Sequence, residues 1–171
     1  SMVSLAQSEL GIPVSPEEFD SDPWALNVAN GTLDLQTGKL SPPDRRAMIT
    51  KIIPVDYDPT ADCPTWLGFL DRVMGGDKDL IQFLQRAVGY SLTASIKEQV
   101  FFILHGSGQN GKTTFLMAIR EILGDYGLTA QAETMLIRRN SGIPNDIARL
   151  KGARMVTATE AEAGKRLAES L

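Results

Sequence analysis

The sequence predicts an α/β protein, with a small α-rich (α+β) N-terminal domain over residues 1–95 and a second domain with a parallel sheet over residues 96–171. Three observations lead to this prediction. Seven of the nine prolines lie in residues 1–59, which excludes long helices there. Helical spacing of apolar residues begins at Pro64, and a strand, loop, helix, strand order begins at Val100.

The first part of the chain reads as short strands and turns. Residues 26–35 have the pattern of a hairpin around Asn30-Gly31, and a second turn at residues 36–38 leads to Leu40. Residues 49–55 form a β-branched run that Pro54 interrupts, which favours an edge strand.

Two helices follow, and together they predict a helical hairpin over residues 60–95. The first begins at Pro64, a favourable first helical position, and ends at Gly75-Gly76. The second covers residues 78–89, where apolar residues lie on one stripe.

The last third begins with a continuous apolar run at residues 100–104, which predicts a strand buried on both faces, with Phe101 and Phe102 in the core. A helix follows over residues 112–123, with Phe115 in the core. Residues 128–136 are ambiguous. The other expected elements are a short helix at 145–150, a strand at 153–159 and a helix at 162–170.

Composition limits the classes of function. The net charge of −4 argues against a protein whose whole surface binds nucleic acid or anionic membranes. No run of 18 apolar residues exists and the N-terminus lacks signal-peptide features, so we expect a cytoplasmic protein with no membrane partner. One cysteine, Cys63, and one histidine, His105, exclude an internal disulfide framework and multi-ligand Cys or His metal centres.

The central motif is a glycine-rich loop at residues 106–113 that matches G-x-x-x-x-G-K-[ST] in full. Its glycines allow backbone N–H groups to wrap triphosphate oxygens, and the following helix points its positive end at them. A plain glycine turn before a helix is the alternative, but it does not require Lys-Thr. The residues expected to bind ATP are Gly106, Ser107, Gly108, Gln109, Asn110, Gly111, Lys112, Thr113 and Thr114.

Catalysis at such a loop needs Mg²⁺ and an acidic residue at the end of a neighbouring strand. Lys112 is expected to contact the β and γ oxygens, and Thr113 to offer its hydroxyl to Mg²⁺. Glu160 follows the predicted strand and is expected to bind Mg²⁺ or polarise water. Glu162 shares its face if the strand continues, and is the second candidate to polarise the attacking water. A solvated surface charge is the alternative for Glu162.

These residues occur in a set of motifs that resembles the phage/plasmid primase-helicase family and its poxvirus relatives. Individual N-terminal motifs are short, but their order and spacing match over nearly the whole chain from about residue 10. The matching segments are residues 24–35 (WALNVANGTLDL), 57–59 (YDP), 63–66 (CPTW), 84–90 (LQRAVGY), the loop 106–113, 152–160 (GARMVTATE) and 164–169 (GKRLAE).

The resemblance implies a superfamily 3 helicase, an AAA+-like P-loop ATPase that forms a ring, usually a hexamer, and drives DNA replication. It implies ATP and Mg²⁺ as cofactors, and as partners DNA, further copies of the chain and replication proteins. Lys112, Thr113 and Glu160 map onto the ATPase positions. Glu162 fits less well, because the family more often places two acidic residues side by side and Thr159 occupies the first position here.

Only 59 residues follow Lys112, so the family's later motifs, including the arginine finger, are not in this sequence. We therefore expect a fragment with a C-terminally incomplete ATPase domain, inactive by itself. Two other readings stay open: a non-enzymatic nucleotide-binding module for assembly or partner docking, and a P-loop small-molecule kinase. Four arginines are candidates for arginine fingers or DNA contacts, with surface charge or ion pairs as the alternative: Arg138, Arg139, Arg149 and Arg154.

Overall fold

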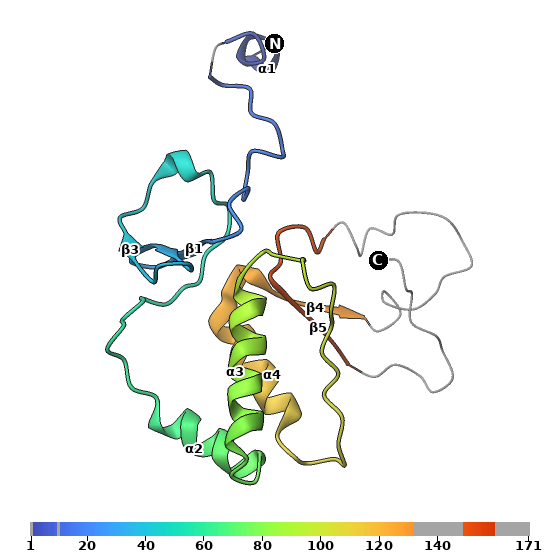
Figure 1. Ribbon diagram of the computed structural model, residues 1–171. Coiled ribbons are helices and arrows are strands. Elements are labelled where there is room, and N and C mark those ends of the chain that lie inside the picture. The colour runs from blue at the N-terminus through green and yellow to red at the C-terminus, as the bar shows by residue number, and fades with distance from the viewer. Residues whose placement is uncertain (1, 10, 132–148, 160–171) are drawn as a thin grey trace, which may run out of the picture.

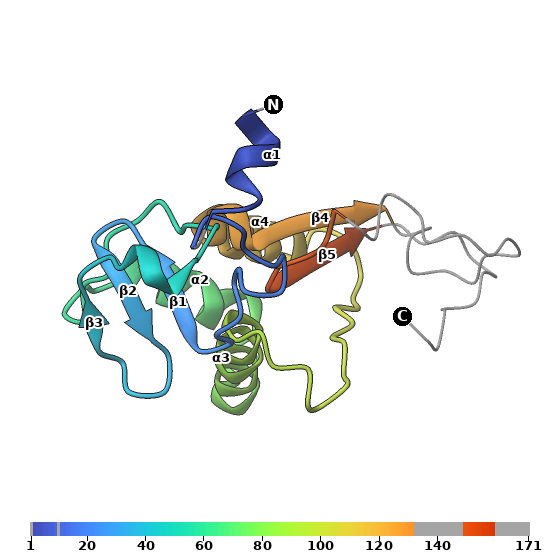
Figure 2. The ribbon, with the colours of Figure 1, turned by 90° about the horizontal axis from the view of Figure 1, so that it is seen from above.

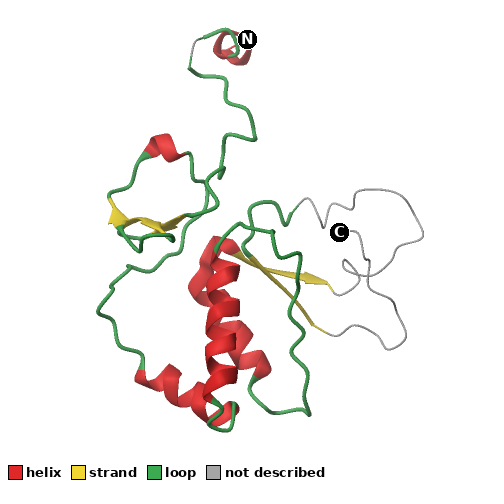
Figure 3. Cartoon of the chain, viewed as in Figure 1, coloured by secondary structure: helices red, strands yellow, loops and turns green. Residues whose placement is uncertain are grey.

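The computed structural model of the chain describes residues 2–9, 11–131 and 149–159 (Figure 1). Helices, an antiparallel sheet and a small parallel sheet occur together, as Figure 3 shows. The prediction of a mixed helix and sheet protein is confirmed in this α+β form. The predicted helices at 145–150 and 162–170 lie largely or wholly outside the described residues.

The N-terminal part contains a short helix, α1 (Met2–Ala6), and an antiparallel sheet of β1 (Ala25–Val28), β2 (Gly31–Asp34) and β3 (Leu40–Ser41). The predicted hairpin is confirmed, because Val28 pairs with Gly31 and Leu26 with Leu33. Burial alternates along both strands, so one face of the sheet supplies apolar side chains to the core.

The predicted helical hairpin is also confirmed. Helix α2 (Pro64–Val73) has proline at its start, and α3 (Lys78–Leu92) extends three residues beyond the predicted end. Asp77 caps α3, since its carboxylate accepts a hydrogen bond from the N–H of Leu80 at 3.0 Å. Figure 1 shows α3 at the centre of the molecule, with α2 beside its lower end.

The C-terminal part contains α4 (Lys112–Leu123), β4 (Gly127–Gln131) and β5 (Met155–Thr159). Helix α4 matches the prediction, and Gly124 ends it. The strands β4 and β5 pair in parallel, with Gly127 opposite Met155 (Figure 2). Only the 3₁₀ turn Gly124–Tyr126 separates α4 from β4, and the two elements are in contact. Arg120 of α4 also donates to the hydroxyl of Thr129 in β4 at 2.7 Å.

The prediction of a buried strand at residues 100–104 is wrong. The segment is extended, but within the described chain it pairs with no strand, and Phe101 and Ile103 are 68% and 73% exposed. Phe102 is also exposed, with its ring edge-on to that of Phe83 at 6.1 Å. The apolar run satisfies the pattern of a central strand, but β4 and β5 pair with each other and no described strand lies against it.

The edge strand predicted at residues 49–55 is likewise wrong, apart from one position. Ile53 forms a single parallel bridge with Val28, and its N–H donates to the carbonyl of Asn27 at 2.9 Å. Pro54 has no N–H to donate, so the segment pairs on its β1 side, where the N–H of Ala29 also donates to the carbonyl of Val55 at 3.1 Å. The bridge is nevertheless sufficient to bring the buried Ile53 side chain against the sheet.

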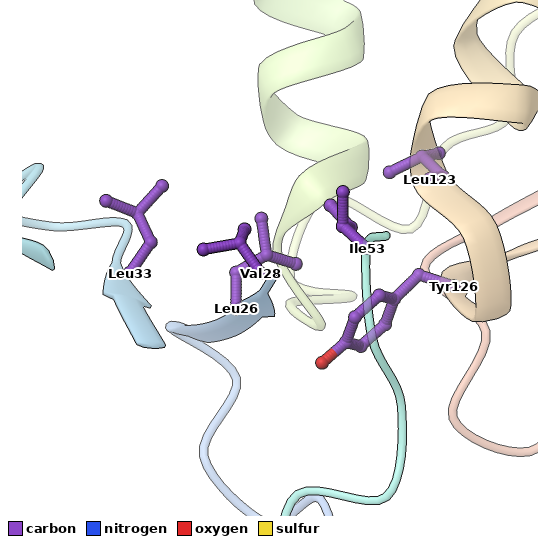
Figure 4. Close-up of a cluster of buried hydrophobic side chains, with 6 residues drawn as sticks. All are labelled: Leu26, Val28, Leu33, Ile53, Leu123 and Tyr126. Carbon is purple, nitrogen blue, oxygen red and sulfur yellow. The ribbon is translucent and has the colours of Figure 1, made fainter. Parts of the chain in front are cut away.

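In the described part of the chain, a cluster of buried side chains joins the two halves, as Figure 4 shows. The first half supplies Leu26, Val28, Leu33 and Ile53, and the second half supplies Leu123 and Tyr126. Among the described residues, Tyr126 and Leu123 are the largest fully buried side chains, and both belong to the second half. The division at residue 95 stays a prediction, but the two parts share this core.

Arg154 adds a polar connection beside this core. Its guanidinium donates to the carbonyl of Leu92 at 2.6 Å and to that of Ala25, and lies 4.9 Å from the centroid of the Tyr126 ring. Its own N–H donates to the carbonyl of Tyr126 at 2.9 Å. Arg154 is half-buried, and the reading of it as a surface charge is replaced by an internal link from the start of β5 to β1 and α3.

Tyr126 is expected to make the fold sensitive to alkaline pH. Burial raises the pKa of Tyr126, although the N–H of Asn27 and the charge of Arg154 oppose the shift. The unfolded chain releases this proton near about pH 10, so stability is fully present below about pH 10 and falls as the pH rises through the higher folded-state value. Urea unfolding at about pH 8 and about pH 10.5 measures the fall.

The matched variant is Tyr126→Phe, which keeps the ring but removes the ionisable hydroxyl. It also loses the hydrogen bonds that this hydroxyl makes with the N–H of Asn27 and the carbonyl of Lys51, each at 3.3 Å. We therefore expect lower stability at the lower pH but a smaller loss between the two pH values. An equal loss in both proteins would contradict the assignment to Tyr126.

Candidate functional site

The loop 106–113 connects the extended segment to α4. Gly111 occupies the position before the helix in the left-handed conformation, with φ of 85° and ψ of −3°, and Lys112 is the first helical residue. No side-chain hydrogen bond caps this end of α4 within the described chain. The first turn of a helix leaves backbone N–H groups without intrahelical partners and attracts anions, so this end is chemically suited to phosphate.

Three of the predicted residues come together in this loop. The Nζ atom of Lys112 donates to the carbonyl of Gly106 at 3.0 Å and to Oδ1 of Asn110 at 2.7 Å. The side chain of Lys112 thus turns back across the loop. The amide of Asn110 lies against Gly106, where any side chain at that position would collide with it.

Most of the other predicted binding residues have exposed side chains. The side chains of Ser107, Gln109, Thr113 and Thr114 are exposed, and Gln109 adopts a positive φ of 59°. A Cβ added at Gly108 would meet nothing within 4 Å, so the space around it does not require a glycine. The two threonines belong to the first turn of α4.

Helix α2 packs directly against this loop, a contact that the sequence analysis missed. A Cβ at Gly111 would lie 2.7 Å from Cγ1 of Val73 and 3.3 Å from Cζ of Phe69. Trp66 stacks on Phe115 of α4, with ring centroids 5.7 Å apart. Apolar residues at helical spacing on α2 were the available signal, but they predict a buried face without saying what covers it.

The predicted acidic and arginine residues are described only in part. Glu160, Glu162, Arg138 and Arg139 lie outside the described residues, although β5 ends at Thr159, immediately before Glu160. Arg149 is exposed. Among the described residues, no three Asp, Glu, His or Cys side chains gather at one point to hold a metal ion.

The single histidine and the single cysteine are both exposed. His105 is exposed at the end of the extended segment, and Cys63 is exposed at the start of α2. In the described parts of the chain, no helix combines the length and apolar character needed to cross a membrane.

Comparison with known proteins shows two similarities, one of them confined to the N-terminal region. Residues 1–75 match the family described as D5 N terminal like. A protein of Acanthamoeba polyphaga mimivirus that carries the name "Putative helicase" is 26% identical over 128 residues. That alignment covers 72% of this chain and only 13% of the viral protein. Both findings are similarities to helicase-associated proteins.

The N-terminal region of the chain is similar to that of the phage and viral primase-helicase family, in agreement with the resemblance found in the sequence motifs. The chain spans about 13% of the length of the curated relative. The activity, substrates and partners of a longer protein are therefore taken up below as proposals.

Proposed function

We propose that the chain binds MgATP at the loop 106–113 and forms part of the ATP-driven motor of a replicative DNA helicase. The observation that carries this proposal is the position of Lys112. Its ammonium group crosses a glycine-rich loop at the uncapped N-terminus of α4, where it can exchange the carbonyl of Gly106 and the amide oxygen of Asn110 for phosphate oxygens. Relatedness to primase-helicases supports the same assignment.

The residues present fit a triphosphate and Mg²⁺. Lys112 would hold the β and γ oxygens, backbone N–H groups at the start of α4 would hold a phosphate, and the exposed hydroxyl of Thr113 would reach the metal ion. Bound ATP would supply the phosphoanhydride bond that is broken. Glu160, which follows β5 directly in the sequence, would orient water at this site.

Partners follow from the same proposal. A DNA motor would act on single-stranded or forked DNA as a ring of several copies, and replication proteins would bind it.

An assembly module that binds nucleotide without hydrolysis is the second candidate. The exposed apolar side chains of Val100, Phe101 and Ile103 favour it, because such a surface is suited to another protein surface.

The first test is titration of the chain with a fluorescent ATP analogue in the presence of Mg²⁺. We expect Lys112→Ala to weaken binding by about tenfold or more, since a hydrogen bond to a charged group contributes about 1.5–3 kcal/mol. Lys97→Ala is the matched control, because Lys97 is exposed and lies outside the loop. Absence of binding by the unaltered chain, or equal binding by Lys112→Ala, would contradict the proposal.

A further inference from the structure

The junction between the loop and α4 rests on a helix from the N-terminal half. Gly111 has no side chain, and the space where one would stand is filled by Val73 and Phe69 of α2. Val73 is the last residue of α2 and is half-buried. The backbone of Gly111 therefore has little freedom to move toward α2, and its left-handed conformation is enclosed by these two side chains.

A second contact between the same two helices lies one turn further along α4. Phe115 is buried, with 5% of its surface exposed, and its N–H donates to the carbonyl of Gly111 at 2.9 Å. Trp66 stacks on Phe115 with an interplanar angle of 17°, and Phe69 stacks on Trp66 at 5.3 Å. The three rings form a layer that ties the first turn of α4 to α2.

We propose that α2 is a positioning element for the loop 106–113, acting through Val73 on Gly111 and through Trp66 on Phe115. This inference rests on the proposed binding of nucleotide at the loop. Val73 has no hydrogen-bonding group in its side chain, so its contribution is to fix the backbone from which Lys112 and the first N–H groups of α4 project. The consequence is a reciprocal link: nucleotide at the loop acts on α2, and α2 sets the affinity for nucleotide.

The test compares ATP-analogue binding by Val73→Ala, Val73→Thr and Leu67→Ala at a temperature where all three are folded. Val73→Ala removes the contact with Gly111, whereas Val73→Thr keeps the branched shape. Leu67 lies on the same helix but is 53% exposed, so it is the matched control. We expect binding to weaken by about fivefold in Val73→Ala and by less than about twofold in the other two.

A second readout uses the fluorescence of Trp66. The chain has two tryptophans, so Trp24→Phe leaves Trp66 as the single probe. We expect saturating nucleotide to change its emission, and Lys112→Ala to abolish the change. No binding by the unaltered chain would overturn the proposed function together with this inference. If Val73→Ala bound the ATP analogue as tightly as the unaltered chain, and nucleotide left the Trp66 emission unchanged, only the role of α2 would be overturned.

Discussion

Replacing Gly111 by alanine is expected to destabilise the fold by about 2–5 kcal/mol and to abolish nucleotide binding. The left-handed conformation at φ of 85° costs a non-glycine residue about 1–2 kcal/mol. The new Cβ would also stand 2.7 Å from Cγ1 of Val73, and overpacking of this kind costs about 1–3 kcal/mol. Urea unfolding and titration with an ATP analogue measure the two effects.

Gly108→Ala is the control within the same loop. Gly108 does not have a positive φ, and a Cβ there would meet nothing within 4 Å, so we expect a change within about 0.5 kcal/mol. Combining Gly111→Ala with Val73→Ala should restore the stability lost to the clash with Val73. It should not restore the stability lost because alanine disfavours the positive φ at position 111. Equal effects of the two glycine substitutions would contradict the account of this junction.

Replacing Arg154 by methionine is expected to destabilise the fold by about 2–4 kcal/mol. The substitution removes two hydrogen bonds from a charged donor, to the carbonyls of Leu92 and Ala25, and the contact with the Tyr126 ring. It leaves two carbonyl groups without this donor in a partly buried place. Burial lowers the pKa of Arg154, because desolvation disfavours the charged guanidinium. This desolvation offsets part of what the contacts contribute to stability.

Arg149→Met is the matched control, because Arg149 is exposed and precedes the same strand. We expect it to change the free energy of unfolding by no more than about 0.5 kcal/mol. Thermal and urea unfolding, followed by circular dichroism, measure both variants. If Arg154→Met were as stable as Arg149→Met, the guanidinium would not link the two halves energetically.

The elements that the sequence predicted correctly are those that local patterns specify. Asn30-Gly31 favours a tight hairpin turn, and β1 and β2 pair around it. Pro64 begins α2, because proline fits the first position of a helix, and Gly124 follows the end of α4, where glycine is favoured. The motif at the loop predicted the start of α4 at Lys112 in the same way.

The predictions that failed concern what an apolar segment packs against. The run at residues 100–104 has the composition of a buried strand, but burial also needs a partner strand, and periodicity carries no information about one. Phe115 was correctly assigned to the core, while Phe101 was not. Both are phenylalanines in apolar surroundings, so the difference arises from the tertiary contact of Phe115 with Trp66.

The candidate site shows the same limit. The sequence identified Lys112 and Gly106 from their spacing, because the chemistry of a phosphate loop is local. It could not identify Val73 or Arg154 as supports, because each acts on a segment distant in the chain: Val73 on Gly111, and Arg154 on Ala25. Long-range contacts of this kind follow from the packing of the halves and not from any motif.

The most direct test of the central claim is the ATPase activity of a longer protein that carries this sequence, measured with and without single-stranded DNA. The account predicts hydrolysis that DNA stimulates and that Lys112→Ala abolishes, while Lys97→Ala leaves it unchanged. ATP binding without DNA-stimulated hydrolysis would contradict the motor assignment and would leave the nucleotide-dependent assembly module as the function of the chain.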